Sequence, residues 1–355
     1  MNDICIVIGA TGSAGPELVR LLVTKGYSVR AIARAAPSPH LLPPEVQLCL
    51  GDILDPAFLR RSLMDARYVF HLAAKLHVVS PTVEMKAEYC KVNVEATQNI
   101  VNVCRNYKVE HLVYFSTVNV YGHAGCISRA APGHLQQEAP HDNGIVDEDT
   151  IPRPCGIYAE TKRQGEEVVV NGTAPGQHAT RATVLRFGTI YGPHMKGNFV
   201  RLVRALAHGR FILVGNGANR RTVIYEEDAA RAACLAAEHP GSTQRTYNVS
   251  DGKIHTVSEI LSAICSALGR RPPRAFVPAS TAKVAAHIGD MLLLLLGRPA
   301  QLRSTVEKLI EDMAVRSERI QRELGFTPRV NLQQGWARTL ERWSSEDAWA
   351  MTPRR

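Results

Sequence analysis

The fold is decided near the start of the chain by the stretch Ile4-Cys5-Ile6-Val7-Ile8-Gly9-Ala10-Thr11-Gly12-Ser13-Ala14-Gly15. It opens with an apolar, largely β-branched run, which is typical of a strand buried on both faces of a sheet. A helical pattern begins at Pro16, which suits a first helical turn because its missing N–H would have no partner there. In such a unit Gly9 permits the turn, Gly12 lets the backbone approach a pyrophosphate, and Gly15 lets the helix pack on the strand. The stretch therefore predicts a nucleotide-binding loop.

The composition is that of an ordinary globular protein. The chain has 355 residues, of which 45% are hydrophobic and 21% charged, so it can bury a large core. No cationic segment precedes an apolar one at the N-terminus, and we therefore expect a cytoplasmic protein. The 8 cysteines contain no C-x-x-C pair, which predicts reduced thiols rather than a zinc site or a disulfide framework. The net charge of +9 suits an anionic ligand, but no basic run interleaved with aromatic residues predicts nucleic-acid binding.

Short β-type runs alternate with helical patterns through the first half of the chain. The expected strands are Ile4–Ile8, Ser28–Ala33, Val46–Leu50, Tyr68–Leu72, His111–Ser116 and Thr183–Arg186. Helical stretches such as Pro56–Met64 and Val92–Tyr107 separate them. This alternation predicts an α/β fold with a Rossmann-type doubly wound parallel sheet, whose ligands bind at the carboxyl ends of the strands.

From about Asn198 the pattern loosens into helices with strand fragments, so the sheet should be nearly complete by then. We expect a nucleotide-binding domain over residues 1–187, to which part of 223–250 returns. A smaller, mostly helical substrate domain should follow over 188–345, with a tail at 346–355.

A second informative pattern is the pair Tyr158 and Lys162, four residues apart on an expected helix and hence on one face. A nearby ammonium favours the phenolate, so a tyrosine with an ordinary pKa near ~10 could exchange a proton at neutral pH. Thr117 ends an expected strand, where its hydroxyl could hold the reacting oxygen.

Together these motifs resemble the extended short-chain dehydrogenases/reductases, also called the NAD-dependent epimerase/dehydratase family. The resemblance runs from Ile4 to about Trp343. It implies an NAD(P)-dependent oxidoreductase or epimerase in which Tyr158 is the general acid/base and Thr117 orients the substrate oxygen. Lys162 would bind the nicotinamide ribose and lower the pKa of the phenol. The implied cofactor contacts are Gly9, Thr11, Gly12, Ser13, Ala14, Gly15, Asp52, Ile53, Leu72, Ala73, Ala74, Asn93, Tyr158 and Lys162.

The resemblance also bears on the choice of cofactor. Members that prefer NAD usually carry an acidic residue at the end of the second strand, where this chain has Ala33 followed by Arg34. A carboxylate there would repel the 2′-phosphate of NADP, whereas a guanidinium can pair with it. We therefore expect NADP to be favoured over NAD, with Arg34 as a further cofactor contact.

Two residues point to the substrate. Asn198 and Arg221 look like the diphosphate contacts of family members that act on nucleotide-sugars. Thr189 stands where 4-epimerases and dehydratases commonly have asparagine, which favours the ketoreductase branch. The departure also keeps open a 3β-hydroxysteroid dehydrogenase-like activity on an apolar secondary alcohol. A non-catalytic nucleotide-binding regulator is the remaining alternative, and the intact Thr117 and Tyr158 argue against it.

Three other features have plainer interpretations. The apolar run Met291–Leu296 is far shorter than the ~20 residues of a membrane span, so we expect a packed helix or a lipid-facing edge. His123, His134 and His141 have irregular spacing, which favours a lid over the substrate and predicts no metal site. The helix Asn93–Tyr107 either packs on its own sheet or forms half of a homodimer interface, and we expect a homodimer.

Overall fold

The structure is a computed structural model that describes residues 3–76, 83–122, 144–173, 180–295 and 302–345. The segment with His123, His134 and His141, expected to form a lid, lies outside these ranges.

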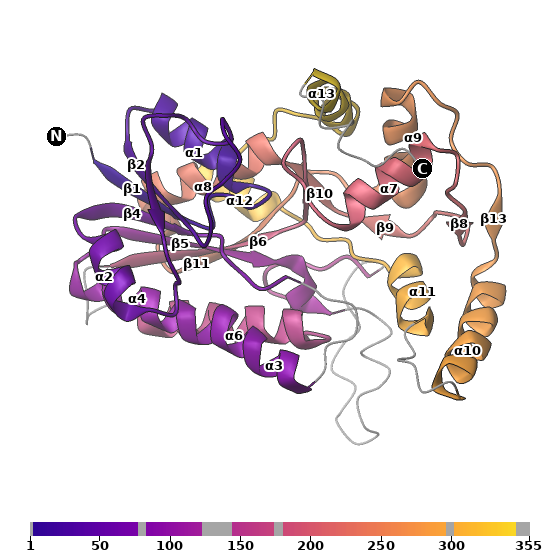
Figure 1. The fold of residues 1–355 in the computed structure, drawn as a ribbon, viewed down its shortest axis with the longest axis horizontal. Coiled ribbons are helices and arrows are strands. Elements are labelled where there is room, and N and C mark those ends of the chain that lie inside the picture. Colours follow the sequence, from indigo (N-terminus) through magenta and orange to yellow (C-terminus); the bar gives the residue numbers. More distant parts are fainter. Residues whose placement is uncertain (1–2, 77–82, 123–143, 174–179, 296–301, 346–355) are drawn as a thin grey trace.

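Seven parallel strands form the central sheet in the order β11-β6-β5-β4-β1-β2-β3 (Figure 1). Their bounds are β1 (Ile4–Ile8), β2 (Ser28–Ala33), β3 (Gln47–Leu50), β4 (Ala66–His71), β5 (His111–Thr117), β6 (Arg181–Phe187) and β11 (Arg245–Val249). The first six agree with the expected strands to within a few residues. The strand order reverses between β1 and β4, and ligands of doubly wound sheets bind at this reversal.

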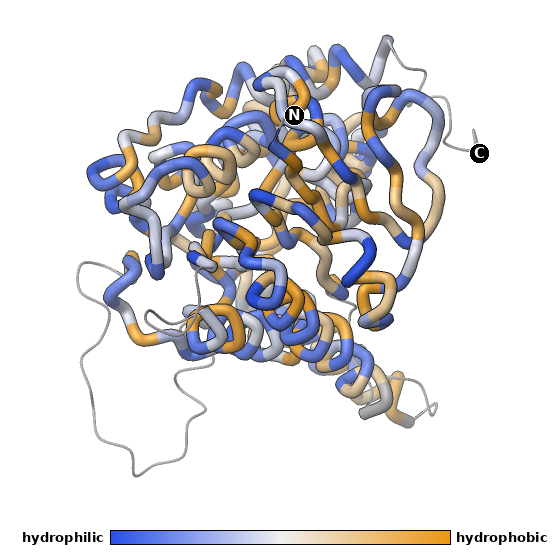
Figure 2. Tube along the Cα trace, turned by 90° about the vertical axis from the view of Figure 1, so that its left-hand side faces the viewer, coloured by the Kyte–Doolittle hydropathy of each residue, from blue (hydrophilic) through white to orange (hydrophobic). Residues whose placement is uncertain are grey.

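Helices cover both faces of the sheet (Figure 1). One face carries α1 (Gly15–Thr24), α8 (Glu226–Glu238) and α12 (Glu318–Leu324). The other carries α2 (Pro56–Leu63), α3 (Val83–Cys90), the π-helical turn η1 (Lys91–Glu95), α4 (Ala96–Asn106) and α6 (Ile157–Gly172). Successive residues of β1 alternate between the two cores, with Val7 in one and Ile8 in the other. Along the covering helices the trace alternates between hydrophilic and hydrophobic residues (Figure 2).

The sheet is not complete at β6, because β11 pairs with β6 along Arg245–Val249. The expected strands did not include β11, since the sequence Arg-Thr-Tyr-Asn-Val lacks an apolar run, but β11 lies within 223–250, part of which was expected to return to this domain. Its polar residues form hydrogen bonds to other elements. The Tyr247 hydroxyl donates to Glu323 at 3.0 Å, and the side-chain amide of Asn248 donates to the Arg316 carbonyl at 3.0 Å.

The second lobe combines short strands with helices. Its strands are β7 (Thr189–Tyr191), β8 (Leu213–Val214), β9 (Arg220–Arg221), β10 (Val223–Tyr225), β12 (His255–Thr256) and β13 (Phe276–Val277). Its helices are α7 (Asn198–Ala207), α9 (Val257–Ala267), α10 (Ala279–Leu295), α11 (Leu302–Ile310) and α13 (Leu332–Ser345). The core of this lobe is centred on the buried Trp336, whose ring stacks on Tyr191 at 4.9 Å. Within the described ranges no helix is both long and apolar enough to cross a membrane.

Candidate active site

The glycine loop joins β1 to α1 and leaves no space for side chains at two of its glycines. A Cβ on Gly9, which has φ +89°, would lie 2.7 Å from the Ala73 nitrogen, and one on Gly15 would lie 2.4 Å from the Ala10 carbonyl oxygen. The segment after β4 closes on this loop, because Leu72 and Ala73 both donate their N–H groups to the Ile8 carbonyl, at 2.9 and 3.0 Å. Two sets of expected cofactor contacts, far apart in the sequence, therefore lie side by side.

The start of α1 is suited to an anion. Its N-cap residue, Ala14, provides no side-chain cap, although the Gly15 N–H donates to the Gly12 carbonyl at 3.3 Å and Pro16 has no N–H. The single carboxylate of the first turn, Glu17, is paired with Arg20 at 3.3 Å. Thr11, Gly12 and Ser13 are partly exposed in front of this helix end. The crowded glycines and the uncapped helix fit the pyrophosphate of a dinucleotide.

The ends of β2 and β3 lie next to each other and carry the expected adenosine-side contacts. Gly51 donates its N–H to the Ala33 carbonyl at 3.1 Å, which ties the two strand ends together. Ile53 is buried, while Asp52 is exposed and caps its own turn by accepting from the Leu54 N–H at 2.9 Å. Arg34 follows β2 and is exposed.

Asn93 lies in the π-helical turn η1 and links two parts of the site. Its side-chain oxygen accepts from the Lys75 N–H at 2.7 Å, and its amide donates to the Thr161 hydroxyl on α6 at 3.0 Å. The π-helical turn, a form that often marks functional sites, carries this buried side chain toward α6. Asn93 thus holds the segment after β4 against the helix that carries Tyr158.

Tyr158 and Lys162 lie on the first turns of α6, and Thr117 lies at the end of β5. The Lys162 ammonium is buried and sits 4.0 Å above the centre of the Tyr114 ring. Burial lowers the pKa of Lys162 to about 7, while the nearby Glu166 carboxylate opposes this shift. Thr117 is partly exposed, and its hydroxyl oxygen accepts from the Asn119 N–H at 3.2 Å.

The pKa of Tyr158 differs from the expectation. Burial, with a smaller contribution from Tyr89, raises the pKa of Tyr158 to about 12, whereas the motif predicted a lowered value. The difference has a physical reason: burial disfavours the negatively charged phenolate, and this effect outweighs the attraction of a nearby ammonium. Tyr158 therefore holds its proton in this structure.

A buried polar cluster behind Lys162 was not predicted from the sequence. The Glu166 carboxylate accepts two hydrogen bonds from Arg186, at 2.9 and 2.6 Å, and one from the Ser116 hydroxyl at 2.5 Å. Arg186 also stacks over the Tyr121 ring at 4.8 Å. The signal that could have revealed the cluster is the position of Glu166, four residues after Lys162 on the same helix.

The expected substrate residues lie on different elements of the second lobe. Asn198 is exposed and is the first residue of α7. Arg221 lies on β9, and its guanidinium donates to the Glu311 carbonyl. Burial lowers the pKa of Arg221 from its ordinary value.

Two contacts from the segment after β7 reach the glycine loop and the helix α1 that follows it, and both were missed. The Lys196 ammonium donates to the Thr11 carbonyl at 2.8 Å. His194 lies 3.4 Å from the Arg20 guanidinium and shares a hydrogen bond of 2.7 Å with Glu226. The second lobe is thereby attached to the loop that would hold the pyrophosphate.

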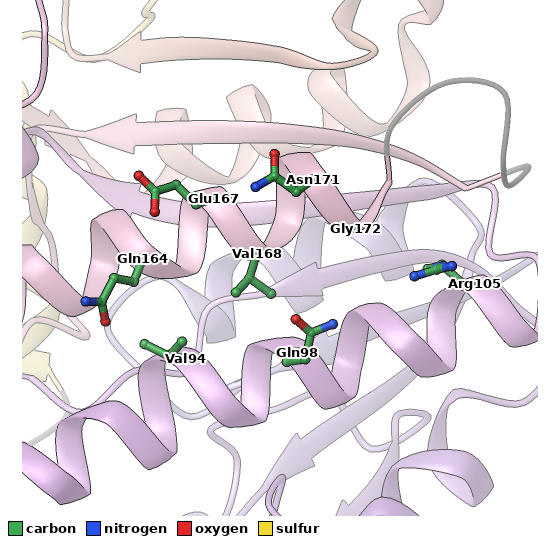
Figure 3. Close-up of a pocket in the computed structure, with 8 residues that line it drawn as sticks. All are labelled: Val94, Gln98, Arg105, Gln164, Glu167, Val168, Asn171 and Gly172. Atoms are coloured by element: carbon green, nitrogen blue, oxygen red, sulfur yellow. The ribbon is translucent and has the colours of Figure 1, made fainter.

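One pocket lies between α4 and α6 (Figure 3). Its lining residues are Val94, Gln98, Arg105, Gln164, Glu167, Val168, Asn171 and Gly172. None of them is an expected site residue, so this pocket is not the reaction site.

The cysteines depart from one expectation. Cys155 is disulfide-bonded, so the prediction that the cysteines are all thiols is wrong at this position. Cys5, Cys49 and Cys90 are among the free thiols, in agreement with the prediction. The side chains that the structure describes contain no group of three or more metal-binding residues.

Known proteins are similar over almost the whole chain. Residues 5–250 match the model of the NAD dependent epimerase/dehydratase family. A 2-alkyl-3-oxoalkanoate reductase from Stenotrophomonas maltophilia (strain K279a) is 30% identical over 94% of this chain and 97% of the relative. An N-acetyl-alpha-D-glucosaminyl-diphospho-ditrans,octacis-undecaprenol 4-epimerase from Escherichia coli O157:H7 is 24% identical over 96% and 95%.

Among solved structures, MoeE5 in complex with UDP-glucuronic acid and NAD is 27% identical. It has a TM-score of 0.72, covering 98% of this chain and 100% of that chain. The family match spans the glycine loop, Thr117 and the Tyr158/Lys162 pair. The chain therefore belongs to the NAD dependent epimerase/dehydratase family and is an NAD-dependent oxidoreductase or epimerase.

Proposed function

We propose that the enzyme acts at C4 of a nucleotide-sugar, reducing a 4-keto group or inverting the hydroxyl there. Tyr158 donates the proton to the substrate oxygen, Thr117 orients that oxygen, and Lys162 binds the nicotinamide ribose. The cofactor supplies the hydride at nicotinamide C4. The remaining cofactor contacts are those of the glycine loop, the segment Leu72–Ala74, and Asp52 with Ile53.

The observation that carries the proposal is the arrangement of α6, where Lys162 is buried and Tyr158, four residues before it, is partly exposed. A phenol with its pKa raised to about 12 keeps its proton at neutral pH and is suited to donate it. A lysine with its pKa lowered to about 7 can still carry charge near neutrality. Proton donation is the task of the acid in ketone reduction, and the reverse transfer serves alcohol oxidation, so the pair suits hydride chemistry in either direction.

Two features support a substrate that carries a diphosphate. The N-terminus of α7 has Gly197 as its N-cap, no side-chain cap and no acidic residue in its first turn, so its N–H groups favour an anion. Arg221, a partly exposed residue whose guanidinium also donates to the Glu311 carbonyl, adds a positive charge in the same lobe. The MoeE5 structure contains a UDP-sugar, and the name of the Escherichia coli relative includes a sugar diphosphate.

A second candidate is the reduction or oxidation of an apolar secondary alcohol, as in 3β-hydroxysteroid dehydrogenases. The relative at 30% identity has a name that specifies an alkyl-oxoalkanoate. Several large apolar side chains of the second lobe, including Ile288 and Leu292, are also exposed.

We further propose NADP as the favoured cofactor, because Ala33 offers no carboxylate to repel a 2′-phosphate and Arg34 is exposed beside it. A homodimer is proposed through α4 and α6, where Val94 and Val168 line the pocket between the helices (Figure 3). Cytoplasmic location stays a proposal as well; the free thiols support it, whereas the disulfide at Cys155 does not.

The decisive experiment follows reduced nicotinamide by absorbance with both cofactors against UDP- and dTDP-4-keto-sugars, UDP-sugars and a 3β-hydroxysteroid. We expect turnover of a nucleotide-sugar. UDP binding, measured by calorimetry, should weaken about 10- to 100-fold in Arg221→Ala, because a charge-assisted contact is lost. The matched control is Arg220→Ala, whose guanidinium is paired with Asp312 at 3.0 Å. Equal UDP affinity in both variants, with turnover of the steroid, would favour the second candidate.

A further inference from the structure

Most large apolar side chains of the helix α10 face solvent, whereas a helix packed on a protein core would bury them. The residues that turn inward are small: Ala282 and Ala286 are buried, and Gly289 lies against Leu302 of α11. A Cβ on Gly289 would lie 2.6 Å from the Leu302 side chain, so the two helices pack closely along this small-residue face.

The opposite face of α10 carries large apolar side chains that are more than half exposed. They are Val284, Ile288, Met291, Leu292 and Leu294. The first four recur at the three- and four-residue spacing that places side chains on one face of a helix. Packing among the described residues leaves this face exposed, and its apolar side chains are available to an interaction partner.

The patch continues beyond α10. Strand β13 pairs with β8, and this pair carries Phe276 and the neighbouring Ile212, both more than half exposed. The segment from the end of α9 through β13 to α10 runs along one edge of the molecule (Figure 1). This edge, formed by Ile212, Phe276 and the outer face of α10, is called the α10 edge below.

The charges along this edge are mainly positive. The exposed basic residues are Arg210, Arg270, Arg271, Arg274 and Lys283. The acidic Asp290 is engaged at the start of α11, where its carboxylate accepts from the N–H groups of Leu302 and Arg303 at 2.8 and 3.0 Å. Lys283 is the only lysine or arginine of α10, so the attraction to anionic headgroups comes mainly from the arginines that precede the helix.

The size of the face argues against a second copy of the chain. A helix of 17 residues is roughly 25 Å long, and a strip about 10 Å wide on α10 alone, before Ile212 and Phe276 are added, covers on the order of 250 Å². A stable dimer needs about 800 Å² per partner. A bilayer sets no such requirement, because it accepts each apolar side chain separately while the basic residues add attraction to anionic headgroups.

We propose that the α10 edge binds the surface of an anionic phospholipid bilayer, with α10 lying in the interface plane. The outer side chains of α10 enter the boundary between headgroups and acyl chains. Arg274 and Lys283 contact the phosphates, and the reaction site stays on the aqueous side. This association goes beyond the proposed function and holds for any substrate.

The test is co-sedimentation of the full chain with vesicles of phosphatidylcholine, with and without phosphatidylglycerol. We expect binding that is at least about tenfold tighter with phosphatidylglycerol and that weakens as salt is raised. The double variant Ile288→Ser/Leu292→Ser should lose this binding. Met64→Ser is the matched control, since Met64 is also an exposed apolar residue but follows α2, and it should bind like the wild type.

Size-exclusion chromatography with light scattering and circular dichroism, on the same proteins without lipid, completes the test. The double variant should keep its fold and its oligomeric state, because the substituted side chains are exposed. Absence of wild-type binding to anionic vesicles overturns the proposal. A change of oligomeric state in the double variant alone also overturns it, in favour of a contact between copies of the chain.

Discussion

Arg186 and Glu166 form an ion pair of two hydrogen bonds, 2.9 and 2.6 Å long, that is almost completely buried between β6 and α6. Glu166 lies one helical turn after Lys162, and its charge raises the pKa that burial lowers. The pair thus connects the central sheet to the electrostatics of the reaction site. Ser116, the residue before Thr117, donates to the same carboxylate and fixes the end of β5 against α6.

Replacing Glu166 tests this connection. Glu166→Gln leaves the Arg186 guanidinium buried without its counter-charge, which should lower the free energy of unfolding by about 3–5 kcal/mol in urea denaturation. The pKa of Lys162 should fall further. In a plot of kcat/KM against pH, the apparent pKa that is due to Lys162 should therefore move to lower pH. Glu167→Gln is the control, because Glu167 is half exposed and paired with Arg163 at 3.3 Å. Similar losses of unfolding free energy in the two variants would contradict the prediction that the buried Arg186–Glu166 pair matters more than an exposed one.

Tyr158→Phe should abolish turnover, with kcat falling on the order of 100-fold or more, because the proton donor is removed. Cofactor affinity, measured by fluorescence titration of the reduced nicotinamide, should stay nearly unchanged. Tyr107→Phe is the control, since this tyrosine is exposed at the end of α4. Activity of Tyr158→Phe within a few-fold of the wild type would refute the assignment.

The parts of the fold that were predictable from sequence are those with local patterns. The apolar run of β1 and the glycines after it depend on neighbours in sequence, and the structure agrees with them. Part of 223–250 was expected to return to the sheet domain, but β11 itself was not among the expected strands, because its partners are distant. Asn248 accepts from the Tyr121 hydroxyl, and its backbone N–H donates to Glu148. A strand whose polar residues are satisfied by remote elements has no local apolar pattern.

In the candidate active site too, local patterns were predictable from sequence and contacts between distant residues were not. The spacing of Tyr158 and Lys162 predicts a shared helix face, and both lie on α6. The raised pKa of Tyr158 was not predictable, because it depends on burial, which the spacing does not determine. The contact of Lys196 with Thr11 joins residues almost two hundred positions apart, and only the packing of the two lobes creates it.

Two buried histidines should make the protein sensitive to acid. Burial lowers the pKa of both His71 and His111 to about 3, from an ordinary value of 6.5. Between these values the unfolded chain binds protons that the folded chain does not. The free energy of unfolding should therefore fall as the pH decreases from 6.5 toward 3, by about 1.4 kcal/mol per pH unit for each histidine.

The substitution His111→Gln separates this contribution from others. Glutamine does not titrate and can keep a hydrogen bond to Thr183, which His111 contacts at 2.8 Å. Urea denaturation at several pH values should show a smaller acid slope for this variant. His208→Gln, at an exposed position after α7, should keep the wild-type slope. An unchanged slope in His111→Gln would show that this histidine is not the source.

The choice of cofactor depends on the end of β2. Ala33 places no carboxylate there. The ribose hydroxyls of NAD therefore find no acceptor at this position, and the 2′-phosphate of NADP is not repelled. Arg34 is exposed and can pair with phosphate oxygens through its planar guanidinium. We therefore expect kcat/KM to be higher with NADPH than with NADH. In Arg34→Ala this ratio should fall about 10- to 100-fold, as a charge-assisted pair is lost.

A neighbouring arginine supplies the control for this prediction. Arg30 lies on the same strand, but its guanidinium donates to the Gln47 side chain at 2.9 Å and to the Met64 carbonyl at 2.5 Å. It is therefore occupied within the protein, and Arg30→Ala should leave the cofactor ratio unchanged. Ala33→Asp should move the preference to NADH, because the new carboxylate accepts from the ribose hydroxyls and repels the 2′-phosphate. A wild-type enzyme that prefers NADH, or an Arg34→Ala variant with an unchanged ratio, would contradict the role given to this strand end.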